Sequence, residues 1–133
     1  MNVGIIGSGG REHAICVSLK NSEKANNIYC FPGNAGTSLI AQNIESNLDD
    51  FEELRGLIQK FNIDLVIIGP EKPLVDGLVD YLKKNNIKVF GPNKVASQLE
   101  GSKIFTKKLC EKYNIPTAKF GVFDTIRNSL SFL

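Results

Sequence analysis

A glycine-rich turn near the start of the chain leads directly into charged and ionisable side chains. Gly7-Ser8-Gly9-Gly10 is followed by Arg11, Glu12 and His13, the only histidine of the chain. Glycines let a backbone approach an anion closely, and N–H groups at the start of a helix attract negative charge. The planar guanidinium of Arg11 suits phosphate or carboxylate groups. The turn therefore predicts a site for a phosphorylated ligand, and the alternative is a tight turn with a solvated Arg11. His13 is as well suited to a structural hydrogen bond as to catalysis.

The same turn matches only half of the dinucleotide fingerprint G-x-G-x-x-G. Gly7 and Gly9 fit it, but Glu12 stands at the third glycine position. The strand expected at 27–31 is followed by Pro32-Gly33, with no acidic residue that could bind the ribose hydroxyls of a dinucleotide. Classical NAD or FAD binding is therefore not favoured.

Further polar loops follow other expected strands. PGNAGT (32–37) supplies two glycines, an amide and a hydroxyl, which can turn tightly and hydrogen-bond a sugar or phosphate. GPEKPL (69–74) holds Glu71 between two prolines, where it could bind a ribose hydroxyl or an amine, or could be a capping or solvated residue. Because the carboxyl ends of parallel strands share one edge of a sheet, we expect these loops to meet the glycine turn there.

The chemistry that these loops can support is binding. None of them offers a nucleophile beside a base, and none offers a set of metal ligands, so we expect no catalytic residue and no metal site in this chain. The edge is predicted to bind a small, phosphorylated, hydroxyl-rich molecule.

The elements that position these loops alternate between strand and helix. This alternation predicts an α/β fold of three layers, with a mostly parallel sheet and helices on both faces. Strand patterns occupy 3–6, 27–31, 42–44, 64–69, 88–91 and 118–123, and helical patterns occupy 11–20, 49–61, 73–84, a short stretch within 91–103, 103–113 and the residues from 124 onward. The last helix has Ile126, Leu130 and Leu133 set for a core face and ends without a cap. We therefore expect a fragment of a longer protein.

Composition excludes several classes of protein. Of the 133 residues, 42% are hydrophobic and 23% charged, which is typical of a globular domain. A net charge of +2 is too small for a nucleic-acid-binding surface, and no apolar run is long enough to cross a membrane. Three cysteines without a C-x-x-C pair indicate reduced thiols in the cytoplasm. A local group of lysines comprises Lys103, Lys107, Lys108 and Lys112, and for all of them except Lys103 the pattern is typical of a solvated helix face.

Several strings taken together resemble a known family. They are GSGGREHA (7–14), PGNAGT (32–37), GPEKPLVDGLVD (69–80), FGP (90–92) and QLEGSKIFTK (98–107). In order and spacing they are similar to the N-terminal part of the glycinamide ribonucleotide synthetases, the phosphoribosylamine–glycine ligases of the ATP-grasp superfamily. This resemblance covers nearly the whole chain.

The resemblance implies both an architecture and an activity. Residues 1–101 would form a Rossmann-like pre-ATP-grasp domain, and 102–133 the truncated start of the ATP-grasp region. The full-length enzyme would use ATP and Mg²⁺ to join glycine to 5-phosphoribosylamine in purine biosynthesis, releasing ADP and phosphate. Its partners would be these small substrates in the cytoplasm, with no nucleic acid and no membrane. The fragment, without the main lobes, is expected to bind no cofactor and to be inactive alone.

The resemblance also implies particular site residues. Lys103 matches a lysine that lies near the ATP phosphates in such enzymes. The positions implied for phosphoribosylamine are Gly9, Gly10, Arg11, Glu12, Asn34, Gly36, Thr37 and Glu71.

Other functions remain open at this point. The chain could be the N-terminal domain of another ATP-grasp enzyme, such as a biotin carboxylase or another purine ligase. It could be a nicotinamide dinucleotide-binding oxidoreductase domain, or a scaffold whose edge docks against absent lobes.

Overall fold

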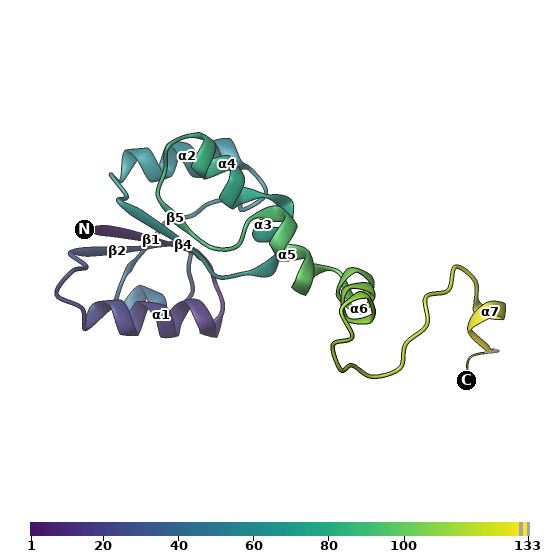
Figure 1. Cartoon of the computed structure of the whole chain (residues 1–133). Helices are drawn as coiled ribbons and strands as arrows, with labels where there is room; N and C mark the ends of the chain where they lie inside the picture. Colours follow the sequence, from purple (N-terminus) through teal and green to yellow (C-terminus); the bar gives the residue numbers. More distant parts are fainter. Residues whose placement is uncertain (131, 133) are drawn as a thin grey trace. The chain divides into compact units, whose positions relative to one another are not determined.

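A parallel sheet forms the centre of the N-terminal part of the chain in the computed structural model, which describes residues 1–130 and 132 (Figure 1). Within these residues the sheet has the strand order β3-β2-β1-β4-β5. All neighbouring strands pair in parallel. The strands are β1 (Asn2–Gly7), β2 (Asn27–Pro32), β3 (Gln42–Asn43), β4 (Leu65–Ile68) and β5 (Val89–Phe90).

Helices cover both faces of this sheet, as expected for a three-layer α/β fold. One face carries α1 (Gly10–Lys20), and the other carries α2 (Phe51–Lys60) and α4 (Leu78–Lys84) (Figure 1). Consecutive residues of a strand point to opposite faces, so Ile5 packs in the α1 layer and Ile6 in the α2–α4 layer. Two hydrophobic clusters, one on each side of β1, therefore hold the layers together.

Local signals in the sequence explain where the helices begin and end. α2 starts after Asp50, whose carboxylate accepts hydrogen bonds from the N–H groups of Glu52 (3.1 Å) and Glu53 (2.9 Å). The single helix expected over 73–84 is wrong. Gly77 adopts a left-handed conformation (φ 101°) and divides the stretch into α3 (Glu71–Asp76) and α4.

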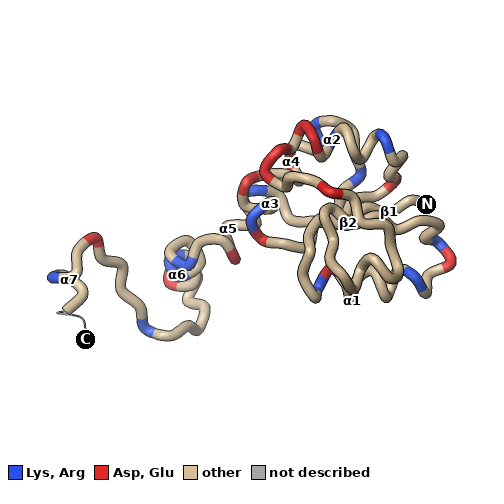
Figure 2. The backbone as a smooth tube through the Cα atoms, turned by 180° about the vertical axis from the view of Figure 1, so that it is seen from behind, with Lys and Arg blue, Asp and Glu red and all other residues tan. Residues whose placement is uncertain are grey.

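The chain divides into two compact units, Met1–Ser97 and Gln98–Leu133. The boundary falls within α5 (Lys94–Gly101), close to the glycine break expected there. In the second unit, α6 (Lys103–Lys112) carries the lysine group, visible as blue segments in Figure 2. Ser102 caps it by accepting a hydrogen bond from Phe105 N–H at 3.2 Å.

The strand expected at 118–123 does not form. A strand needs a neighbour to pair its backbone groups, and the described residues of the second unit contain no strand. Lys107 instead binds this segment, donating to Thr117 Oγ1 (2.6 Å) and to the carbonyl of Ala118 (2.9 Å).

The final helix differs from expectation in its burial. α7 (Ile126–Leu130) forms, but Ile126 is 80% exposed and Leu130 is 65% exposed, so the expected core face is uncovered within the described residues. Leu133, the third residue of that face, lies outside the described residues. No helix in the described part of the chain is long and apolar enough to cross a membrane.

Candidate functional site

The loops singled out in the sequence meet at one edge of the sheet. β1, β2 and β4 end level with one another, since Gly7 lies opposite Pro32 and Ile6 lies opposite Ile68. Backbone bonds continue past the strand ends: Gly33 N–H donates to the Gly7 carbonyl at 3.1 Å, and Gly69 N–H donates to the Ile6 carbonyl at 3.1 Å. The expected convergence of the loops is confirmed.

Glu12 lies inside this edge, at the start of α1. The residue is only 3% exposed, and its Oε2 accepts a hydrogen bond of 2.6 Å from the N–H of Gly9. Its Oε1 lies 3.4 Å from Nε of Arg11. Glu12 is the third residue of the helix, from where a glutamate can reach back to cap the helix start. Its carboxylate is therefore used within the protein.

Two glycines make the room that Glu12 occupies. A Cβ at position 69 would overlap Oε1 of Glu12 and lie 2.6 Å from its Cδ, and a Cβ at Gly7 would lie 2.8 Å from the same Cδ. Distances this short are essentially never seen for real Cβ atoms. Glycine at both positions is thus a condition for burying this side chain.

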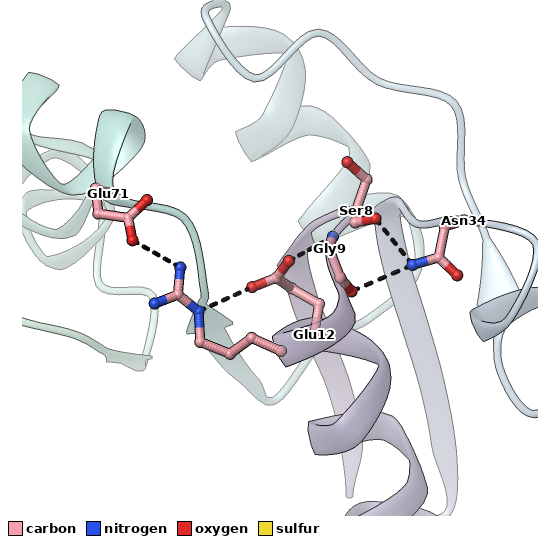
Figure 3. Close-up of polar contacts among 6 residues, drawn as sticks. Ser8, Gly9, Glu12, Asn34 and Glu71 are labelled. Atoms are coloured by element: carbon pink, nitrogen blue, oxygen red, sulfur yellow. Dashed lines mark hydrogen bonds and ion pairs between the residues drawn. The ribbon is translucent and has the colours of Figure 1, made fainter.

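Arg11 and Glu71 form an ion pair at the surface of the same edge. Nη2 of Arg11 donates to Oε1 of Glu71 at 2.9 Å, and the two side chains are 55% and 47% exposed. This hydrogen bond and the negative charge of Glu71 raise the pKa of the Arg11 guanidinium, so it stays protonated. Figure 3 shows the resulting line of contacts from Glu71 to Glu12 and Gly9.

Asn34 fastens the second loop to the glycine turn (Figure 3). Its Nδ2 donates to the carbonyls of Ser8 (2.8 Å) and Gly9 (3.2 Å). Its Oδ1 accepts from the N–H groups of Gly36 (2.7 Å) and Thr37 (2.9 Å). The amide therefore uses both ends to hold backbone, which sets the distance between the two loops.

The hydroxyl of Thr37 and the side-chain amide of Asn43 hold the backbone of Asn34 in place. Thr37 is fully buried, and its Oγ1 accepts from Asn34 N–H at 2.7 Å. Asn43 donates through Nδ2 to the carbonyl of Asn34 at 2.8 Å, and its Oδ1 lies 2.8 Å from the Thr37 hydroxyl. Sequence reasoning missed Asn43. The signal that could have found it is a polar residue in the short strand expected at 42–44, which pairs with Tyr29 and Cys30 of β2.

His13 and Gly10 differ in their surroundings. The imidazole of His13 lies against the second loop, since a Cβ at Gly36 would be 3.0 Å from its Nδ1 and Cε1. The position of Gly10 is open, with nothing within 4 Å of where a Cβ would be. His13 is thus a packing neighbour of the loop, while Gly10 offers exposed backbone at the start of α1.

Two thiols, which we call the buried thiol pair, lie between α1 and β2. The Sγ atoms of Cys16 and Cys30 are 3.2 Å apart, and both residues are fully buried. Burial raises the pKa of both, that of Cys30 to about 12. Both are free thiols, as expected, and neither has the character of a reactive nucleophile.

The structure brings together every residue implied for phosphoribosylamine. All of them lie in the first unit, and most are joined by the hydrogen bonds above. Lys103 belongs to the second unit, where it is the first residue of α6 and is exposed. Among residues 1–130 and 132, no group of three or more His, Cys, Asp and Glu residues could hold a metal ion.

A hollow of about 550 Å³ lies away from this edge. It is bordered by the end of α1, the start of β2 and the segment that leads into the first residue of β3, including Lys20, Asn27 and Gln42. The residues of the polar network do not line this hollow. The surface shape and the side-chain chemistry therefore indicate two different candidate sites. We base the candidate site on the side chains, because they hold the buried carboxylate and the connected hydrogen bonds.

Comparison with known proteins gives one consistent result. Residues 1–100 match the family model described as phosphoribosylglycinamide synthetase, N domain. The chain is 47% identical over 133 residues to the phosphoribosylamine–glycine ligase of Clostridium acetobutylicum and 44% identical to that of Caldanaerobacter subterraneus. In both cases the match covers 100% of this chain and 32% of the relative. The chain thus spans about a third of the length of these curated relatives.

Solved structures agree with this match. The crystal structure of phosphoribosylamine–glycine ligase from Thermotoga maritima has a TM-score of 0.71 and 30% identity, covering 99% of this chain and 30% of that one. The biotin carboxylase domain of a single-chain bacterial carboxylase also reaches 0.71, at only 12% identity, which indicates a shared fold alone.

Proposed function

Because the chain belongs to the phosphoribosylglycinamide synthetase N-domain family, we propose that it is the N-terminal, substrate-binding part of an ATP-dependent ligase. This ligase joins glycine to 5-phosphoribosylamine, with ADP and phosphate as the other products, in purine biosynthesis. The observation that carries the proposal is the connected line of Gly9, Glu12, Arg11 and Glu71 at the carboxyl edge of the sheet.

Within this proposal the site residues divide into two groups. Arg11 and Glu71 present charged groups at the surface, where a guanidinium and a carboxylate can bind ribose hydroxyls and an amine. Gly9, Gly10 and Gly36 let the ligand approach the backbone. The residues that hold these groups in place through internal hydrogen bonds are Glu12, Asn34 and Thr37.

We assign only one residue of this chain, Lys103, to the ATP-dependent step. ATP supplies the phosphoryl group that activates the glycine carboxylate. Lys103, exposed at the start of α6, is suited to contact a phosphate as a point charge. Mg²⁺ is usually held by one or two carboxylates together with substrate phosphates, and we assign none of its ligands to this chain. We assign residues 1–101 to the pre-ATP-grasp domain and 102–133 to the start of the ATP-grasp region, and we place the protein in the cytoplasm with small molecules as its partners.

An NMR titration of this chain with glycinamide ribonucleotide, the stable product, tests the proposal. We expect saturable amide shifts at Arg11, Gly36 and Glu71, and none with NADH. Arg11→Ala and Glu71→Gln should each weaken binding about tenfold or more, the effect of losing a charge-assisted hydrogen bond. Lys72→Ala is the matched control, because Lys72 is an exposed charge whose ion pairs, with Asp49 and Asp76, lie outside the site.

Each other outcome of this titration contradicts a stated part of the proposal. A response to NADH alone would favour a dinucleotide-binding domain. Silence toward both ligands would contradict substrate binding by this chain, and equal weakening in Lys72→Ala would contradict the assigned residues. We expect the chain alone to release no phosphate from ATP in the presence of glycine and phosphoribosylamine, so release that depends on both substrates would contradict its assignment as the binding part only.

A further inference from the structure

The start of α1 already holds a negative charge that belongs to the chain. In glycine turns that bind phosphate, N–H groups at the helix start point at the ligand. Here the N–H of Gly9 points at Oε2 of Glu12, at 2.6 Å, and the carboxylate is almost completely buried. A short bond of this kind between an N–H and an ionised carboxylate is among the stronger hydrogen bonds in proteins.

The surrounding backbone is shaped to accept this carboxylate. If position 69 carried a Cβ, the three atoms nearest to it would all belong to Glu12. Gly69 has no left-handed φ that would itself require glycine, whereas Gly7 does (φ 125°). The absence of a side chain at position 69 is therefore explained by the space that Glu12 needs.

Glu12 also stands at the third glycine position of the dinucleotide fingerprint. In that fingerprint the third glycine carries no charge, and the pyrophosphate lies at the helix start. A phosphate at this turn would lie beside a buried carboxylate of the same sign and would have to compete for the N–H of Gly9. Arg11 contacts Glu12 through Nε at 3.4 Å but also pairs with Glu71 at 2.9 Å, so its single positive charge is shared between two carboxylates.

We propose that Glu12 is a specificity-determining residue: its carboxylate fills the anion position of the glycine turn, so the turn excludes phosphate and pyrophosphate groups. The exclusion is a property of this chain by itself. If the chain binds phosphoribosylamine, as the proposed function holds, the turn does not hold the phosphate group of that substrate. This consequence rests on the proposed function.

Inorganic pyrophosphate is the probe, added to the chain at constant ionic strength while the amide resonances of Gly9 and Gly10 are followed. The wild type should show no saturable shift. Glu12→Gly completes G-x-G-x-x-G and frees the Gly9 N–H, so it should bind pyrophosphate at least tenfold more tightly. Glu12→Gln removes the charge but keeps an acceptor for Gly9, and should gain less.

Glu53→Gly is the matched control. Glu53 is likewise the third residue of its helix, α2, and is exposed, so this variant removes an equal charge without opening the glycine turn. It should gain no pyrophosphate binding at Gly9 and Gly10.

Several results would overturn the inference. Saturable binding of pyrophosphate at Gly9 and Gly10 in the wild type would do so, as would a folded Glu12→Gly variant that gains nothing. If Glu12→Gly does not fold, Glu12→Gln decides, and no gain there would also refute the role of the charge. Failure of the glycinamide ribonucleotide titration would count against the proposed function and leave the pyrophosphate comparison intact.

Discussion

Gly69→Ala should destabilise the first unit, and the cause should be Glu12. The new Cβ would overlap Oε1 of Glu12 and lie 2.7 Å from its Cγ, so both cannot keep their places. The backbone at position 69 permits alanine, because its φ is not in the left-handed region. The Glu12 side chain must therefore leave its buried position and give up the N–H of Gly9.

The size of the effect follows from the contact that is lost. A hydrogen bond to a charged group contributes about 1.5–3 kcal/mol, and losing a helix cap costs about 0.5–2 kcal/mol. Both figures describe the same contact between Gly9 and Glu12, so they are not added. Replacing glycine by alanine returns about 0.4–1 kcal/mol by restricting the unfolded chain. We expect a net loss of about 1–2 kcal/mol in the free energy of unfolding.

A double-mutant cycle separates this cause from others. Urea unfolding followed by far-ultraviolet circular dichroism gives the free energies for the wild type, Gly69→Ala, Glu12→Ala and the double variant. In the Glu12→Ala background the alanine at position 69 meets no carboxylate, so only its gain of about 0.4–1 kcal/mol should remain. The coupling between the two positions should therefore be about 1.5–3 kcal/mol. Gly10→Ala is the control, because nothing lies within 4 Å of its Cβ, and it should be neutral or slightly stabilising.

A cost of Gly69→Ala below about 0.5 kcal/mol, the range of ordinary surface substitutions, would contradict a clash with Glu12. An equal cost with and without Glu12 would contradict it as well. In that case the requirement for glycine at position 69 would have another origin.

Three further predictions concern other hydrogen bonds and thiols of the chain. Asn34→Ala should lower the free energy of unfolding by about 2 kcal/mol, because the amide holds four backbone groups. Asn34→Asp, which keeps the accepting oxygen, should lose less in urea unfolding, and equal losses would contradict the role of that oxygen. Iodoacetamide at pH 8 should label Cys110 and spare the buried thiol pair, because burial raises the pKa of both buried thiols. Peptide mass spectrometry measures the labelling of each cysteine, and equal labelling of all three would contradict this prediction. Tyr81→Phe should raise the pKa of Glu52 toward the ordinary 4.5, because the phenol hydrogen bond is the main cause that lowers it. A carboxyl group with a lowered pKa stabilises the fold above its ordinary pKa and loses this contribution as pH falls, so the variant should lose less stability on acidification; an unchanged Glu52 pKa in an NMR titration would refute this.

The strands and the location of the site followed from local patterns in the sequence. Apolar runs such as 64–69 predict buried parallel strands, and parallel strands place their following loops at one edge. The family strings in the same loops identified the family, which the comparisons confirm. The strand expected at 118–123 was wrong because an apolar pattern does not supply a pairing partner, and the helix expected at 73–84 was interrupted by the left-handed Gly77.

The roles of individual polar residues were not readable in the same way. In the sequence Glu12 and Arg11 are equivalent charged neighbours of a glycine turn. In the structure Glu12 is buried against Gly69, while Arg11 extends to Glu71, which is 60 residues away in the chain. Asn43 likewise became visible only once β3 paired with β2.

The sequence by itself therefore determined the order of the five strands of the sheet, the edge at which the loops meet and the family. Only the tertiary structure decided which polar groups are exposed at this edge and which hold the loops together. The physical reason is that periodicity and turn residues act between near neighbours. The space for Glu12 at Gly69, and the hydrogen bond from Asn34 to Ser8, exist only when distant strands are in register.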